Sequence, residues 1–161
     1  MKKLRQLALP VLLLLCFVFG TLHAAAADEL LGSVVDGSVL TDKTEAESTV
    51  YPWLRGSFLS SGSGSLTIAG KGSVTISGST SAYQKVDEIK VTLHLQRLQN
   101  GSWVHVLTMG PKTAYGASYV SNSRTYSVAG GYFYRVTGTH TAIKGGTPES
   151  LVSFTDGIWV P

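Results

Sequence analysis

The stretch from residue 88 to residue 109, EIKVTLHLQRLQNGSWVHVLTM, decides the fold. Apolar residues occupy every second position from Ile89 to Leu95 and alternate with polar ones, which is the period of a half-buried β-strand. Asn100-Gly101 is the strongest short signal for a two-residue hairpin turn, because that turn needs a positive φ at both central positions. The stretch therefore predicts two antiparallel strands joined by a tight turn.

The register of this hairpin follows from its turn. Pairing Gln99 with Ser102 places the apolar residues of the two strands on the same face of the hairpin. A slip of one residue would move one strand's apolar residues to the other face. The other pairs that this register predicts are Leu98–Trp103, Arg97–Val104 and Leu95–Val106.

The stretch SLTIAGKGSVTIS, residues 65–77, shows the same alternation on both sides of a glycine-containing turn at residues 70–72. A hairpin explains this pattern, and one long bent strand has the same parity, so both interpretations remain open. The pairs predicted for the hairpin are Ile68–Val74 and Leu66–Ile76.

About seven short strands separated by turn signals, without a long helical pattern, predict an all-β fold. We expect an antiparallel β-sandwich of the immunoglobulin or fibronectin type III kind, preceded by a signal helix. The expected divisions are a signal peptide at residues 1–27, a flexible leader at residues 28–50 and the sandwich domain at residues 51–161.

The stretch GGYFYRVTGTHTA, residues 130–142, holds several aromatic residues on a further predicted strand. Tyr132 and Tyr134 share one face of this strand, whereas Phe133 and Arg135 share the other. In immunoglobulin-like sandwiches such a strand begins near a tyrosine whose hydroxyl bonds to the backbone a few residues upstream. We therefore expect the tyrosine face to pack in the core.

The first 27 residues have the layout of a secretory signal peptide: a basic head, an apolar run and a tract of alanines. The apolar run is shorter than the roughly 20 residues that a membrane span needs, so no stable span is expected after cleavage. Cys16 lies inside the apolar run and would leave with it, so the mature chain is expected to contain no disulfide. The predicted location is extracellular, either free or associated with the cell envelope.

The net charge of +3 comes from the same segment. Removal of Lys2, Lys3 and Arg5 leaves ten basic residues against ten acidic ones, without a basic cluster. Nucleic acid is therefore not an expected partner.

Three segments together resemble a family of small secreted proteins of Gram-positive, spore-forming bacteria that has no assigned function. They are GSVTISGSTSAYQKVDEIKVTLHLQRLQNGSW, GGYFYRVTGTHTA and SFTDGIWV, and the likeness extends over residues 55–160. The resemblance implies an extracellular sandwich domain and transfers no catalytic or binding residue.

Motifs for catalysis are largely missing from the sequence. AGKGS at residues 69–73 lacks the first glycine of a phosphate-binding loop, where Ser65 stands, and has Gly72 where that loop needs serine or threonine. The histidines of the mature chain, His94, His105 and His140, do not have metal-ligand spacing. We therefore predict no enzyme activity, no cofactor and no metal.

One face of the central hairpin is too apolar for plain solvent surface, and Phe133 and Arg135 would extend it in an immunoglobulin-like topology. Two interpretations remain open: a recognition surface, or a second core covered by Leu30, Leu31 and residues 34–35 of the leader. The candidate binding residues are His94, Leu98, Trp103, His105, Phe133 and Arg135.

These observations favour a secreted, non-enzymatic interaction or envelope-associated module whose partner is an unknown extracellular protein or glycan. The alternative is a small extracellular hydrolase or carbohydrate-active accessory domain that uses histidines and carboxylates on loops, with Glu149 and Asp156 as the candidates in the last third of the chain.

Overall fold

The computed structural model describes residues 27–53 and 58–161. The chain divides into two compact units, residues 1–31 and residues 32–161. The described part of the first unit is residues 27–31, with one helical turn at residues 27–30, and the second unit is nearly all β-strand. The predicted signal segment lies outside the described residues except for Ala27. Within the described ranges, no helix is long and apolar enough to cross a membrane.

Strands in the described residues join into one hydrogen-bonded sheet. Their bounds are β1 Val34–Val35, β2 Ser38–Thr41, β3 Glu45–Val50, β4 Leu59–Gly70, β5 Ser73–Gln99, β6 Ser102–Ser127, β7 Tyr132–Lys144, β8 Thr147–Phe154 and β9 Gly157–Val160. The order is β1-β2-β9-β7-β5-β4-β3, with β6 also paired to β5 and β8 to β7. The sheet is mixed because β2 and β9 run parallel. The mainly β class is thus confirmed, whereas the expected antiparallel sandwich is not, because the sheet is mixed and curled.

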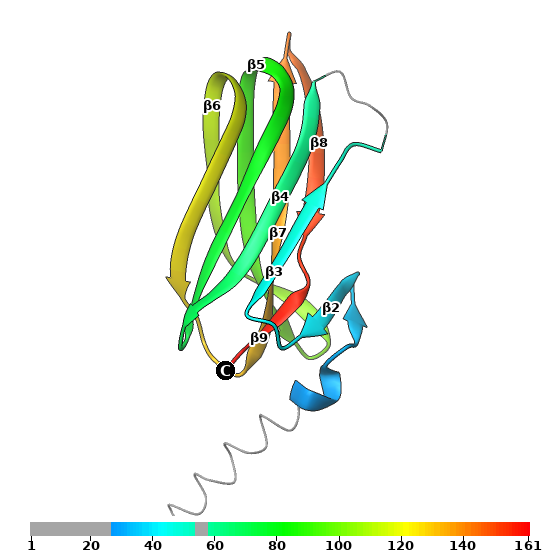
Figure 1. Cartoon of the computed structure of the whole chain (residues 1–161), viewed down its shortest axis with the longest axis vertical. Helices are drawn as coiled ribbons and strands as arrows, with labels where there is room; N and C mark the ends of the chain where they lie inside the picture. Colours follow the sequence, from blue (N-terminus) through cyan, green and yellow to red (C-terminus); the bar gives the residue numbers. More distant parts are fainter. Residues whose placement is uncertain (1–26, 54–57) are drawn as a thin grey trace, which may run out of the picture. The chain divides into compact units, whose positions relative to one another are not determined.

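The two longest strands, β5 and β6, make the sheet curl. Figure 1 shows both of them bending over at the same end of the sheet. Residues 73–81 of β5 pair with β4 and with the last part of β6, and residues 86–99 pair with β7 and with the first part of β6. The single sheet therefore folds into two facing leaves, like half of a barrel. Leaf 1 comprises β3, β4, residues 73–81 of β5 and residues 119–127 of β6; leaf 2 comprises the other strands and strand parts.

The core lies between the two leaves. Alternate residues of β5, such as Ile76 on leaf 1 and Leu93 on leaf 2, are fully buried there. A Cβ at Gly78 would lie 2.8 Å from Cδ2 of Leu93 and 2.6 Å from the carbonyl oxygen of Ser63. A side chain at residue 78 would therefore push the leaves apart, so the glycine is needed for their close approach.

The hairpin turns predicted from the sequence are confirmed. Asn100 and Gly101 have φ values of 52° and 75°, as the tight turn requires. The pairs Leu98–Trp103, Arg97–Val104, Ile68–Val74 and Leu66–Ile76 all form.

The predicted pair Leu95–Val106 is wrong. Leu95 lies opposite Leu107 and Gln96 opposite His105, so Val106 is the extra residue of a β-bulge. Val106 is 41% exposed, and Leu107 packs against the core. The bulge thus turns Leu107 towards the core and leaves Val106 on the outside.

The expected flexible leader at residues 28–50 contains β1, β2 and β3. β3 extends leaf 1 by pairing with β4, and β2 extends leaf 2 by pairing with β9. These strands have two to six residues, too few to show a clear period in the sequence. They form because each adds to the edge of an existing sheet. The β domain consequently begins well before residue 51.

Candidate functional site

The structure distributes the predicted aromatic and histidine surface between buried and exposed positions. It buries Leu98, Phe133 and Arg135 and leaves His94 and Trp103 half-buried. His105 is the exposed member of the set. A contiguous open surface made of all six residues is therefore not present.

Arg135 contacts the segment that covers this part of leaf 2, the turn between β1 and β2. Its Nη1 donates hydrogen bonds to the carbonyl oxygen of Asp36 at 3.1 Å and to Oγ of Ser38 at 3.0 Å. Its Nε donates to Oε1 of Gln96 at 2.8 Å, and its guanidinium lies 4.5 Å from the centre of the Trp103 ring. Burial lowers the pKa of Arg135, and the nearby charge of Asp36 partly opposes that effect. Arg135 therefore joins β7 to the β1–β2 turn.

Trp103 makes a second connection to the same segment. Its indole Nε1 donates a hydrogen bond to the carbonyl oxygen of Val35 at 3.0 Å. A Cβ placed on Gly157 would lie 2.7 Å from Leu40 and 2.9 Å from Trp103, so these two side chains meet over β9. The geometry favours the second of the two interpretations, a small additional core beneath β1 and β2.

His94 and His105 remain beside one another at the edge of leaf 2. Their ring centres are 5.8 Å apart, and Oγ1 of Thr108 lies 2.9 Å from Nδ1 of His94 and 3.4 Å from Nε2 of His105. Partial burial lowers the pKa of His94, and the neighbouring His105 lowers it further. No group of three or more histidine, cysteine or carboxylate side chains that could hold a metal ion occurs in the part of the chain that the structure describes.

His140 and Ser153 have the spacing of a base and a nucleophile, but they lie in the interior. Nε2 of His140 is 2.8 Å from Oγ of Ser153, and both residues are completely buried. Oγ1 of Thr80 donates to the carbonyl oxygen of Lys90 and lies 3.0 Å from Nδ1 of His140. We infer from this network that Nδ1 carries the proton and that Nε2 accepts from Ser153. The cluster satisfies polar groups between the two leaves and offers no path to a substrate.

The outer face of leaf 1 carries a regular array of side-chain hydroxyl groups. Consecutive rows across β3, β4, β5 and β6 follow the strand register. We call this array the hydroxyl face; it comprises Thr49, Ser63, Ser65, Thr67, Thr75, Ser77, Ser79, Ser121, Ser123 and Thr125.

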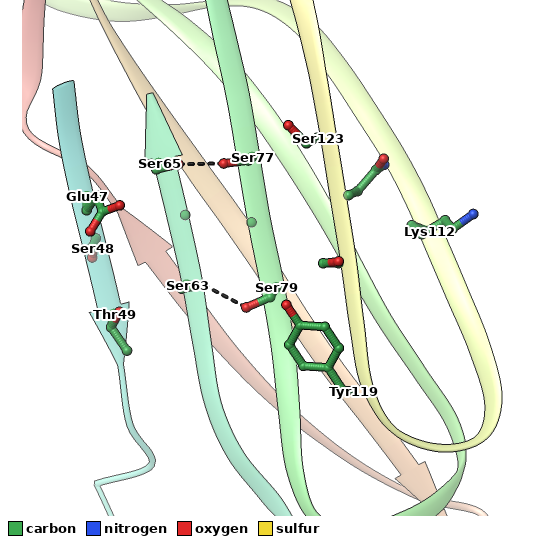
Figure 2. Close-up of a pocket in the computed structure, with 14 residues that line it drawn as sticks. Glu47, Ser48, Thr49, Ser63, Ser65, Ser77, Ser79, Lys112, Tyr119 and Ser123 are labelled. Atoms are coloured by element: carbon green, nitrogen blue, oxygen red, sulfur yellow. Dashed lines mark hydrogen bonds between the residues drawn. The ribbon is translucent and has the colours of Figure 1, made fainter. Parts of the chain in front are cut away.

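Cross-strand hydrogen bonds hold part of the hydroxyl face in place. Oγ of Ser63 and Oγ of Ser79 are 2.8 Å apart, and those of Ser65 and Ser77 are 2.6 Å apart (Figure 2). Thr75 and Thr125 make a similar pair at 2.8 Å. Such pairs fix the rotamers of neighbouring side chains across a sheet.

An open hollow of about 630 Å³ lies over this face. Glu47 borders it on β3, and Lys112 and Tyr119 border it on β6 (Figure 2). Tyr119 is 55% exposed and pairs with Ser81, one row beyond the row that contains Ser79. The hollow is thus lined by neutral polar groups, with one carboxylate, one ammonium group and one exposed aromatic ring around it.

The hydroxyl face was not predicted from the sequence, although the sequence contains a signal for it. Serine or threonine occupies alternate positions in three separate segments, at residues 61–67, 73–81 and 121–127. Period-two alternation places them on one side of each strand. Only the pairing of the strands brings the hydroxyl groups of the three segments onto the same face of leaf 1. The sequence does not show which strands pair.

The fold and the face together define a mainly β domain with a hydroxyl-lined outer surface and a polar cluster sealed in its core. The chain belongs to DUF6147, a family of unknown function whose model matches residues 25–157. Among solved structures, it is similar to a sporulation control protein from Bacillus subtilis, with 13% identity and a TM-score of 0.35 over 73% of this chain and 49% of that one. The chain spans about half the length of that protein. No curated protein matches it.

Proposed function

We propose that the protein is a secreted, non-enzymatic binding module that associates with an extracellular or cell-envelope partner through the outer face of leaf 1. The observation that carries this proposal is the hydroxyl face and the hollow above it. Secretion is supported by the composition of residues 1–27, as argued from the sequence.

The proposed scaffold is an immunoglobulin-like sandwich derived from the curled sheet. Two features support it: the leaves pack face to face, and Oη of Tyr134 donates a hydrogen bond of 2.7 Å to the carbonyl oxygen of Ala129, five residues upstream. That bond resembles the tyrosine corner of such sandwiches. A rigid scaffold of this kind holds the side chains of its outer face in place for recognition without a conformational change.

A binding role suits the chemistry of the site better than catalysis does. The buried pair of His140 and Ser153 is closed to solvent, and burial lowers the pKa of His140 to about 4. The hollow on leaf 1 is lined by hydroxyl groups without a histidine beside them. An activated nucleophile needs an adjacent base, so these hydroxyl groups are suited to hydrogen bonding.

The test uses the purified mature chain, residues 28–161, and the producing bacterium. Mass spectrometry of the culture supernatant should find a mature protein that starts at Ala27 or Asp28. The labelled protein should then sediment with isolated cell walls or intact cells. An intact 161-residue chain in the membrane fraction would contradict secretion, and a protein that stays in the supernatant of every envelope preparation would contradict the binding role.

A further inference from the structure

We propose that the ligand of the hydroxyl face is a neutral polysaccharide strand that lies across β4, β5 and β6 and places a sugar ring against Tyr119. This inference rests on the proposed binding function and names the class of its ligand. It starts from the hydrogen-bonding capacity of the face.

Each hydroxyl group offers one donor and two acceptor sites. A paired serine, such as Ser77, uses only part of that capacity in its bond to Ser65. Among the described residues, the side chains of Ser121 and Ser123 make no hydrogen bond within the protein, and both are exposed. The face can therefore both donate and accept over its whole area, which is what the hydroxyl groups of a sugar require.

The charges around the hollow argue against other ligands. Lys112 is the cation among the lining residues, and Glu47 on the opposite border would repel a polyanion. An apolar ligand would leave the hydroxyl groups without partners, which is unfavourable. A neutral ligand that is rich in hydroxyl groups avoids both penalties.

The spacing of the face suits a polymer. Side chains on one side of a strand recur at roughly 6.6–6.8 Å, and neighbouring strands are roughly 4.8 Å apart. One row of hydroxyl groups continues across four strands, from Thr49 through Ser63 and Ser79 to Ser121, and the two neighbouring rows continue across β4, β5 and β6. A repeating ligand can therefore make repeated contacts with an array that packing already holds in place.

A comparison within one strand shows that this face is not ordinary solvent surface. The outward positions of β5 on leaf 2 include Glu88 and Lys90, which form an ion pair at 2.8 Å. On leaf 1, the outward positions of the same strand from Thr75 to Ser81 carry only hydroxyl groups. Solvent-exposed surfaces usually intersperse charges of both signs, which keep a protein soluble. An uncharged area is consistent with a surface that is covered by a ligand.

Tyr119 supplies the aromatic contact. Its ring is exposed at the border of the hollow, one row from the Ser79–Ser121 pair (Figure 2). Aromatic rings at interfaces combine a large apolar area with few rotatable bonds. Stacking of a sugar ring on Tyr119 would add affinity that hydrogen bonds exposed to water cannot supply alone.

The experiment is affinity electrophoresis of residues 28–161 in gels that contain a soluble neutral β-glucan, soluble chitin oligosaccharides or the polyanion polygalacturonate. We expect retardation by a neutral glycan and none by the polyanion. The main variant is Ser121→Ala/Ser123→Ala, because those hydroxyl groups have no partner in the described residues and their removal should leave the melting temperature unchanged. This variant and Tyr119→Ala should each weaken glycan binding at least tenfold.

Thr141→Val is the matched control, because it removes the hydroxyl pair of Thr141 with Ser150, 3.0 Å apart, from the outer face of leaf 2. It should bind like the wild-type protein. Undiminished binding by both face variants would overturn the proposed site. Envelope binding without retardation by any neutral glycan would overturn the ligand class and leave the binding function intact, whereas loss of both would overturn the proposed function itself.

Discussion

His140 is a buried ionisable side chain whose protonation is coupled to folding. Burial between Thr80 and Ser153 lowers its pKa to about 4 from the usual 6.5. The folded state therefore favours the neutral ring, so its contribution to stability is complete above pH 6.5 and is lost as the pH falls towards 4. That difference corresponds to roughly 3 kcal/mol of unfolding free energy. Urea denaturation at pH 7 and at pH 4.5 should show the decrease.

The variant His140→Asn separates this effect from general acid sensitivity. It should be less stable at pH 7, because it breaks the buried network, but its stability should change less between pH 7 and pH 4.5. Thr141→Val, on the outer face of leaf 2, removes no ionisable group and should keep the wild-type profile. An unchanged pH dependence in His140→Asn would show that His140 titrates normally in the folded protein.

Trp103 decides between a recognition surface and a second core. Its hydrogen bond to Val35 and its contact with Arg135 predict that Trp103→Ala destabilises the fold by about 3 kcal/mol, the lower end of the range for truncation of a large aromatic side chain. Thermal denaturation followed by circular dichroism measures it. Trp53→Ala, at a residue that is 99% exposed, is the control and should leave the melting temperature unchanged. If Trp103→Ala is as stable as the control, the result would favour the interpretation that this region is a recognition surface.

At the scale of elements, the β5–β6 hairpin was the most predictable part of the chain. Alternation over β5 and the Asn100-Gly101 turn are local properties, so the strands and the first part of their register could be read from the sequence. The bulge at Val106 could not be read from the sequence, because a bulged pairing and a regular pairing fit the same pattern of apolar residues on β6 about equally well. The bulge is decided by the packing of Leu107 and Met109 against the core.

Leu93→Asp tests the inward face of β5. Leu93 is 1% exposed and packs against Gly78 of the facing leaf, so the carboxylate would be buried without a partner. We expect loss of the cooperative unfolding transition and of the β signal in far-ultraviolet circular dichroism. Val152→Asp, on the exposed side of β8, should remain folded. A folded Leu93→Asp protein would mean that the assignment of the two faces is incorrect.

At the scale of the whole molecule, β1 and β2 are part of leaf 2 and not a flexible segment that precedes it. A chain that starts at Asp42 lacks both strands and would uncover Trp103 and Arg135, which donate hydrogen bonds to residues 35–38. We expect it to melt at least 5 °C lower than a chain that starts at Gly32, since roughly 1 kcal/mol already shifts the midpoint by several degrees in a domain of this size. Increased binding of a hydrophobic dye should accompany the change. Equal melting temperatures would show that the segment is dispensable, as the expected flexible leader would be.

The sequence by itself determined the β class, the two hairpin turns and the tyrosine-rich strand, because alternation and turn chemistry act over a few neighbouring residues. Only the tertiary structure decided that one continuous sheet curls on itself, that β2 and β9 pair in parallel and that β1 and β2 cover Trp103 and Arg135. It also decided that serines from three distant segments form one face. These features depend on contacts between residues far apart in the chain, and no local pattern specifies which edges and faces will meet.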